Sequence, residues 1–308
     1  MPRFSRSIAH ALLLSLIVAG CGGSSGQTSS GNSSFPGTYA GTYYPIYNSG
    51  VGQWIPPTDS MPFEKVSAIF AAFAHAYSQG NGAIFAYEQD QPEEPVRLPQ
   101  LEEVARQKNP RIKILISLGW GHKDWDYIAA DYTNNANLFV PSVIQFIRDN
   151  GMDGLDIDDE DIGEDGKSGD ISQEDFDGVV ANLRQALDAA AAEDNRNYYL
   201  TITPAGNNED AEGLVETQVD AQNATMFDLI NIQWYFDEEW GKEFLHALKS
   251  IHYPPKRIGT GIDVEMTKCD PDFPPYKKLA GLFNWTMSYD SSCSDFKYTR
   301  QIARKVSY

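Results

Sequence analysis

Eight short apolar runs recur along the chain and predict buried β-strands. They are rich in β-branched and aromatic residues, and most lack polar alternation, which is typical of strands covered on both faces. The runs cover residues 39–44, 65–74, 111–119, 154–158, 198–204, 227–235, 257–264 and 281–287. Their regular recurrence predicts one large sheet or barrel rather than a helical protein.

Four of the segments between these runs have the apolar period of amphipathic helices. They are residues 98–107, 138–151, 172–194 and 238–251. Ser172 is expected to cap the start of the third helix, and Gly151 to end the second. The first connection, 45–64, lacks a good helical pattern, and the fifth connection is weak.

Eight strands with helical crossovers favour an α/β fold, the (β/α)₈ TIM barrel, with an irregular first βα unit. An open doubly wound sheet is the alternative. No glycine-rich nucleotide-binding loop follows the first strand, which counts against the open sheet.

The N-terminal residues 1–20 have the order of a secretory signal, with Arg3 and Arg6 before an apolar run and then Cys21. The run is too short to span a bilayer comfortably. "VAGC" resembles the lipobox of bacterial lipoproteins, which predicts lipidation of Cys21; an ordinary signal cleavage is the alternative. Residues 21–37 then form a lipidated Cys and flexible Gly/Ser tether, and residues 38–308 the catalytic barrel.

This organisation predicts a protein of the bacterial cell envelope, lipid-anchored at the outer membrane or cell surface, or secreted. The only membrane contact expected is through the lipid anchor, and the protein is expected to be a monomer. The sequence does not distinguish inner from outer membrane.

The acidic balance excludes some classes of partner. The formal net charge is −19, and removing Arg3 and Arg6 with the signal gives −21. Such a surface repels nucleic acid and anionic lipid head groups, but not a neutral polysaccharide. Because acidity is also a solubility or salt adaptation, the charge alone identifies no partner.

The cysteines and acidic runs give no sign of a metal site. Cys269 and Cys293 form an even pair in a chain that leaves the reducing cytoplasm, which predicts a disulfide or, alternatively, two free thiols. No Cys/His cluster has zinc spacing, and the acidic run 161–170 lacks the closing acid of a calcium loop. We expect a solvated loop there, and no metal or cofactor.

The stretch "DGLDIDDE", residues 153–160, ends the fourth predicted strand with a run of carboxylates. A strand's period of two puts Asp156, Asp158 and Glu160 on one face and Asp159 with two apolar residues on the other. Because the apolar residues belong against the outer helices, the three acids are expected to point into the barrel. Barrel interiors are apolar except at the C-terminal mouth, where such acids serve chemistry.

The depth of each acid predicts its role at that mouth. Glu160 is outermost and can meet substrate; a glutamate beside anionic neighbours has a raised pKa and can act as a general acid. Asp158 and Asp156 cannot both ionise cheaply, so one is expected to hold a proton and donate it. An exposed acidic turn is the alternative, which the inward parity disfavours.

The stretch resembles the DGxDxDxE signature of glycoside hydrolase family 18, the chitinases and related endo-β-N-acetylglucosaminidases. Asp153 is expected to orient the strand start and is counted with the substrate-binding candidates. "SLGWG" is near the family's SxGG motif, with Trp120 where the second glycine usually stands. "NIQWYFD" resembles the segment whose Tyr holds the acetamido group, here Tyr235 with Gln233, and "GLFNWTM" the segment whose Trp, here Trp285, forms the floor of the cleavage subsite.

The resemblance implies a retaining mechanism in which the substrate's own N-acetyl group attacks the anomeric carbon. In that mechanism Glu160 protonates the glycosidic oxygen and later deprotonates water. Asp158 orients the acetamido nitrogen and stabilises the oxazolinium charge, Asp156 tunes Asp158, and Tyr235 fixes the acetamido oxygen. The expected partner is an N-acetylglucosamine-containing polysaccharide or glycan.

Several alternatives stay open at this point. Asp159 is familiar from the branch that cuts the chitobiose core of N-linked glycans, whereas the Gln233/Tyr235 pair is more like chitinases, which we place first. A non-hydrolytic glycan-capture lipoprotein and cleavage of peptidoglycan are further readings. Aromatic residues in or beside predicted C-terminal loops are expected either to stack on sugars or to pack the loops: Trp120, Trp125, Trp234 and Trp240.

Overall fold

The structure is a computed structural model that describes residues 35, 37–48, 53–120, 122–160, 162, 168–206 and 211–308. The predicted signal, the lipidation at Cys21 and most of the tether lie outside the described residues, as does most of the acidic run 161–170. No helix in these ranges is long and apolar enough to cross a membrane. Ser34–Tyr308 forms one compact unit.

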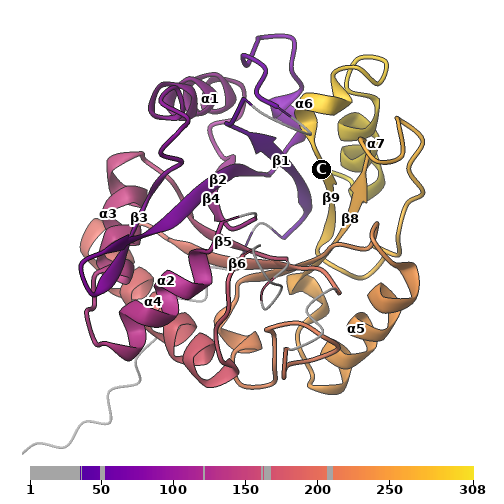
Figure 1. Cartoon of the computed structure of the whole chain (residues 1–308). Coiled ribbons are helices and arrows are strands. Elements are labelled where there is room, and N and C mark those ends of the chain that lie inside the picture. The colour runs from indigo at the N-terminus through magenta and orange to yellow at the C-terminus, as the bar shows by residue number, and fades with distance from the viewer. Residues whose placement is uncertain are drawn as a thin grey trace, which may run out of the picture. The chain divides into compact units, whose positions relative to one another are not determined.

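Eight parallel strands close into a barrel (Figure 1). The neighbour order is β1-β9-β8-β7-β6-β5-β4-β2, and a parallel pairing of β1 with β2 completes the ring. The strands are β1 (Tyr39–Pro45), β2 (Ala68–Gln79), β4 (Lys113–Leu118), β5 (Gly154–Asp159), β6 (Tyr199–Pro204), β7 (Leu229–Ile232), β8 (Ile258–Asp263) and β9 (Gly281–Trp285). All eight predicted strands and the (β/α)₈ TIM barrel are confirmed.

A ninth strand, β3 (Gly82–Tyr87), was not predicted from the sequence. It pairs antiparallel with the far end of β2, from Ala74↔Tyr87 to Gln79↔Gly82. The turn between them contains Gly80 at φ 64°, a conformation that glycine adopts without steric cost. The hairpin therefore extends β2 beyond the barrel wall.

The helices surround the barrel (Figure 1). They are α1 (Glu94–Lys108), α2 (Asp124–Thr133), α3 (Phe139–Asp149), α4 (Gln173–Asp194), α5 (Glu238–Ser250), α6 (Met287–Asp290) and α7 (Lys297–Val306), with 3₁₀ turns η1 (Phe63–Lys65), η2 (Ala224–Met226) and η3 (Pro255–Arg257). Ser172 caps α4 as predicted, accepting a hydrogen bond from the Asp175 N–H. The described part of the first connection holds only η1, so the irregular first βα unit is confirmed; α2, α6 and α7 were not predicted.

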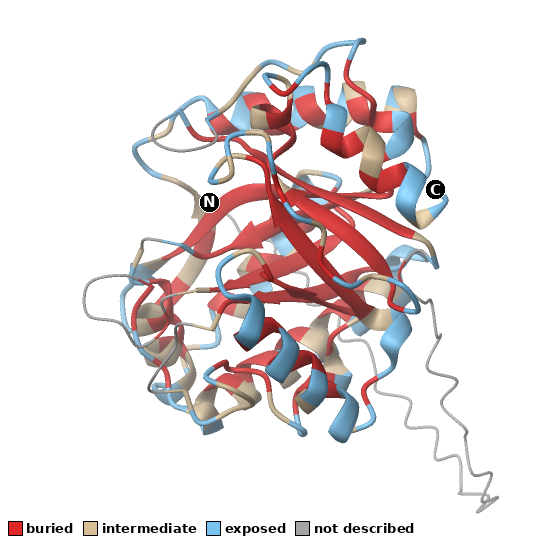
Figure 2. Ribbon diagram, turned by 90° about the vertical axis from the view of Figure 1, so that its right-hand side faces the viewer, coloured by how far each residue is buried: buried red, intermediate tan, exposed pale blue. Residues whose placement is uncertain are grey.

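The strands of the barrel are buried (Figure 2), and apolar side chains form one layer on each side of the barrel wall. The outer layer packs strands against helices and includes Leu155 and Ile157 of β5. The inner layer fills the barrel with aromatic rings such as Tyr43, Phe70 and Phe283. Because side chains alternate along a strand, the outward Leu155 and Ile157 direct the intervening aspartates into the barrel.

Candidate active site

Asp156 is fully buried in the barrel and surrounded by hydroxyl groups. Its Oδ2 accepts hydrogen bonds from Tyr43 Oη at 2.8 Å and Ser117 Oγ at 2.8 Å. Its Oδ1 accepts from Thr201 Oγ1 at 2.5 Å and Thr203 Oγ1 at 3.2 Å. Burial raises the pKa of Asp156, and these hydroxyl hydrogen bonds oppose that effect by favouring the charged form.

Strand register explains why these hydroxyls meet Asp156. Ser117 of β4 and Thr201 of β6 are its direct partners across the parallel ladder. Thr203 follows Thr201 by two positions and so lies on the same face. Short hydroxyl side chains at inward positions therefore give a buried carboxylate the donors that it needs.

A hydrogen-bonded chain joins Asp158 to Tyr235. Gln233 Nε2 donates to Asp158 Oδ1 at 3.1 Å and to the Thr203 carbonyl at 3.0 Å. Tyr235 Oη donates to Gln233 Oε1 at 2.6 Å. Gln233 is buried and holds Asp158 and Tyr235 in one hydrogen-bonded chain; its contact with substrate stays a prediction.

Exposure increases outward along the β5 column. Asp156 is 0% exposed and Asp158 3% exposed, whereas Glu160, just past the end of the strand, is partly exposed. Glu160 and Asp158 both contribute charge that raises the pKa of Tyr235, although burial of the phenol is the larger cause. The outermost carboxylate therefore lies near Tyr235 and has access to solvent, as the sequence predicts.

Gly119 lets the end of β4 approach β5 closely. Its φ is 137°, and a Cβ built there would lie 2.7 Å from the Asp158 carbonyl oxygen and 3.1 Å from the Asp158 Cβ. A larger residue would push Asp158 away from its position. The first glycine of "SLGWG" is thus required by the geometry of the carboxylate column.

Trp285 ends β9 on the inner side of the barrel. Its ring stacks on Phe73, with centroids 6.1 Å apart and planes 23° apart, and lies 5.3 Å from the Tyr43 ring. Phe73 in turn stacks on Tyr47, with planes 4° apart. Since Trp285 is only partly buried, it presents an apolar surface at the same end of the barrel as Glu160.

The four loop tryptophans have different environments. Trp120 is 51% exposed and has φ 60°. Trp125, Trp234 and Trp240 are buried in the outer apolar layer, and Trp240 Nε1 donates to the Val215 carbonyl. Stacking on sugars is therefore excluded for these three residues in this conformation, and of the four only Trp120 offers a free ring face.

Asp153 lies at the amino end of β5, opposite the carboxyl end that carries Glu160. Its carboxylate forms ion pairs with Arg106 at 3.0 Å, Arg196 at 2.9 Å and Lys113 at 3.8 Å. It also accepts the Ile114 N–H. Asp153 thus anchors the start of the strand. Seven residues of extended chain, about 23 Å, separate it from Glu160, so its placement among the substrate-binding residues was wrong.

Asp159 points away from the barrel interior, as the strand period predicts. It is fully buried, and its Oδ2 accepts a hydrogen bond from the Gln218 N–H at 3.1 Å. The side chain therefore holds the segment after β6 and does not face the side of β5 that carries Asp156 and Asp158.

Sequence reasoning missed Asp263, the last residue of β8. It is 3% exposed, and its Oδ1 accepts the N–H groups of Glu265 and Met266 at 2.7 and 2.8 Å. Burial raises the pKa of Asp263 to about 6 despite these two hydrogen bonds. Its charge also raises the pKa of Tyr235. A carboxylate at the C-terminal end of a predicted barrel strand was the available signal.

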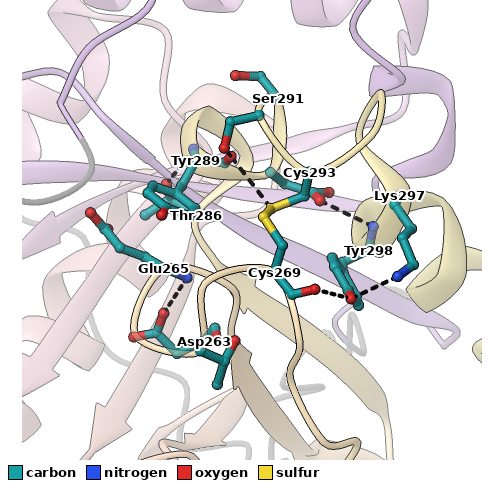
Figure 3. The surroundings of a disulfide bond; sticks show 12 residues. Asp263, Glu265, Cys269, Thr286, Tyr289, Ser291, Cys293, Lys297 and Tyr298 are labelled. Carbon is teal, nitrogen blue, oxygen red and sulfur yellow. Dashed lines mark hydrogen bonds between the residues drawn. A yellow bond between two sulfur atoms is a disulfide. The ribbon is translucent and has the colours of Figure 1, made fainter.

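A disulfide fastens the segment that follows Asp263. Cys269 and Cys293 are bonded with Cα atoms 5.4 Å apart, which selects the disulfide over two free thiols (Figure 3). Tyr298 Oη donates to the Cys269 carbonyl, and the side chain of Cys293 packs in an apolar cluster with Ile262 of β8. The loop after β8 is therefore cross-linked to the chain after α6.

These features define a (β/α)₈ barrel with a column of carboxylates at the carboxyl ends of its strands. The sequence model described as Glycosyl hydrolases family 18 matches residues 41–255, and the chain belongs to this family. The resemblance drawn from the sequence is thereby confirmed.

Relatives agree with this membership. The chain is 30% identical over 165 residues to chitinase A1 of Niallia circulans, covering 51% of this chain and 23% of the relative. It is 28% identical over 135 residues to chitotriosidase-1 of Mus musculus, covering 42% of this chain and 27% of the relative. The chain thus spans about a quarter of the length of the curated relatives it matches. The structure of a GH18 chitinase from Cycas revoluta in complex with (GlcNAc)3 has the same fold, with a TM-score of 0.66, 15% identity, and coverage of 87% of this chain and 99% of that chain.

Proposed function

We propose that the protein hydrolyses β-1,4 bonds between N-acetylglucosamine units of chitin or chitooligosaccharides, with retention and with assistance from the substrate's acetamido group. The proposal depends on Asp158, which belongs both to the carboxylate column of β5, from Asp156 to Glu160, and to the hydrogen-bonded chain through Gln233 to Tyr235. The Cycas revoluta chitinase of the same fold holds (GlcNAc)3, which supports this class of substrate.

The proposed reaction begins when the Glu160 carboxylic acid protonates the glycosidic oxygen. As that C–O bond breaks, the acetamido oxygen bonds to the anomeric carbon and an oxazolinium ion forms. Asp158 accepts the acetamido N–H and stabilises the positive charge, while Tyr235 holds the acetamido oxygen. Glu160 then takes a proton from water, which attacks the anomeric carbon and restores the acetamido group. Tethering the nucleophile to the substrate removes much of the entropic cost of the attack.

The hydroxyl cluster around Asp156 supports its tuning role. Four hydroxyl groups within hydrogen-bond reach suit an ionised carboxylate, which is an acceptor only. Because two adjacent anions are costly in the barrel interior, Asp156 and Asp158 share one proton, which Asp158 holds before substrate binds. When the acetamido group binds, the proton moves to Asp156, whose pKa burial raises, and the ionised Asp158 accepts the acetamido N–H.

The endo-β-N-acetylglucosaminidase and capture functions are the competing proposals. Asp159 was the sequence feature that favoured cleavage of the chitobiose core of N-glycans, but its carboxylate binds the Gln218 N–H on the outward face. Direct recognition of an N-glycan by Asp159 is therefore not supported. Because Glu160, Asp158 and Tyr235 are all present, binding of a glycan without hydrolysis is the less favoured proposal.

The test is incubation of the purified protein with chitin hexasaccharide and, separately, with a high-mannose N-glycopeptide, with products analysed by mass spectrometry. Dimers and tetramers from the hexasaccharide support the proposal. Release of glycan that leaves one N-acetylglucosamine on the peptide would replace it with the N-glycan activity. Binding of either compound without any product would favour capture.

We also propose that Cys21 carries a lipid anchor in the bacterial envelope. The lipobox-like "VAGC" supports this proposal. Metabolic labelling with palmitate should mark the wild-type protein and not Cys21→Ser; equal labelling of both would contradict the anchor.

A further inference from the structure

Three potential metal ligands converge at one edge of the barrel, although the sequence separates them. His75 lies on β2, Glu88 follows β3, and His122 follows β4. One ligand atom from each residue lies within 4.8 Å of those of the other two. The two imidazole rings have centroids 3.9 Å apart, and His122 Nε2 is 3.4 Å from Glu88 Oε1.

The orientation of His75 is fixed by a buried carboxylate. His75 Nδ1 is 3.0 Å from Asp124 Oδ2, and both side chains are almost completely buried. Asp124 Oδ1 accepts the Ala76 N–H at 2.8 Å, so the carboxylate is itself held in place. A proton on Nδ1 shared with Asp124 leaves the lone pair of His75 on Nε2. Metal-binding histidines typically have this carboxylate partner.

We propose that His75, His122 and Glu88 bind one divalent transition-metal ion of the Zn²⁺ type, with Asp124 as the orienting partner of His75. Two imidazoles and a carboxylate form a donor set that zinc accepts, with a fourth position left to water. In a tetrahedral site with bonds of about 2.1 Å, ligand atoms lie about 3.4 Å apart. His122 and Glu88 already have this spacing, and His122 is exposed enough to adjust.

A metal ion at this site is contrary to the expectation of no metal that came from the sequence. Zinc motifs are recognised by short fixed spacings. Here His75 lies within β2, and Glu88 and His122 follow β3 and β4. The unpredicted β2–β3 hairpin brings Glu88 to the side of His75. The negative surroundings also suit a cation, since Asp90 lies beside Glu88.

The site is separate from the carboxylate column and does not depend on the proposed hydrolysis. None of its ligands belongs to β5 or contacts Asp156. The bound ion joins β2, the end of β3 and the loop after β4. Because His122 is two residues from Trp120, binding restrains the segment that carries this exposed ring.

The competing explanation is two metal-free pairs, His75 with Asp124 and His122 with Glu88. Isothermal titration of the chelator-treated, purified protein with Zn²⁺ distinguishes a metal site from these metal-free pairs. The proposal predicts one ion per chain, about tenfold weaker binding or worse for Asp124→Asn, and a larger loss for His122→Gln. His246→Gln, at an exposed histidine on α5, is the matched control and should bind as the wild type does.

Co²⁺ gives a second readout that adventitious surface binding would not share. The wild type should show the visible absorption of a Co²⁺ site with imidazole ligands, and His122→Gln should lose it. Thermal unfolding without metal checks that each variant folds, and added Zn²⁺ should raise Tm for the wild type and His246→Gln but not for His122→Gln. Absence of stoichiometric binding, or equal binding by His122→Gln and His246→Gln, would overturn the proposal.

Discussion

Asp263 is expected to make the stability of this protein depend on pH in a direction opposite to that of an ion-paired aspartate. Burial raises its pKa from 3.8 to about 6. A carboxyl with a raised pKa binds more protons in the folded than in the unfolded state, so its contribution to stability is complete below the unfolded pKa. That contribution is lost as the pH rises through the folded pKa. A shift from 3.8 to about 6 corresponds to about 3 kcal/mol between the two limits.

Asp263→Asn removes this titration and keeps an oxygen that can accept the Glu265 and Met266 N–H groups. Urea unfolding from about pH 4 to about pH 7 covers most of this range, and the variant should gain about 2.4 kcal/mol of stability relative to the wild type as the pH rises. Asp272→Asn, at an exposed position, corrects for the loss of one negative charge. A stability difference for Asp263→Asn that stays constant across this range would refute the assigned cause.

Three further changes test other contacts. Gly119→Ala should cost about 1–3 kcal/mol of stability, because φ at this position is positive and an added Cβ would meet the β5 backbone. It should also lower kcat. Gly37→Ala, with open space around it, should change neither quantity, and equal effects of the two variants in urea unfolding and kinetics would contradict this prediction. Cys269 and Cys293 close a loop with a sequence separation of 24. Replacing both by Ser should lower the free energy of unfolding by about 3.5 kcal/mol. An unchanged urea midpoint would show that the disulfide contributes nothing to stability. Tyr235→Phe removes one hydroxyl and should lower kcat/KM by about 30-fold, as expected for loss of a hydrogen bond worth about 2 kcal/mol; steady-state kinetics on chitin hexasaccharide that match the wild type would exclude its role.

Strand identity and side-chain parity were accessible from the sequence because both depend on local pattern. The apolar runs marked all eight barrel strands, and the period of two placed Asp156 and Asp158 inward and Asp159 outward. Helices α2 and α7 were missed, although α7 is strongly amphipathic and α2 begins with acids. The β2–β3 hairpin was missed although Gly82–Tyr87 is an apolar run that follows a Gly-Asn-Gly turn signal, because β2 continues to Gln79, beyond its predicted end at residue 74.

Contacts between distant segments could not be predicted in the same way. Three ion pairs turn Asp153 toward the amino end of β5, and the partners Arg106 and Arg196 come from other parts of the chain. Burial of Trp125 depends on how α2 packs, which a position in the sequence does not define. The ligands of the proposed metal site likewise become neighbours only through the order of the strands.

The most direct test of the proposed mechanism is the turnover of chitin hexasaccharide by Glu160→Gln. A glutamine keeps the size of the side chain but cannot transfer the proton, and general acid–base catalysis contributes about 10²- to 10⁴-fold. The variant should therefore lose at least about 100-fold in kcat while it binds the hexasaccharide with an affinity close to that of the wild type. Glu243→Gln, at an exposed position on α5, should keep full activity. A Glu160→Gln protein that retains wild-type turnover would contradict the assignment of Glu160 as the acid/base.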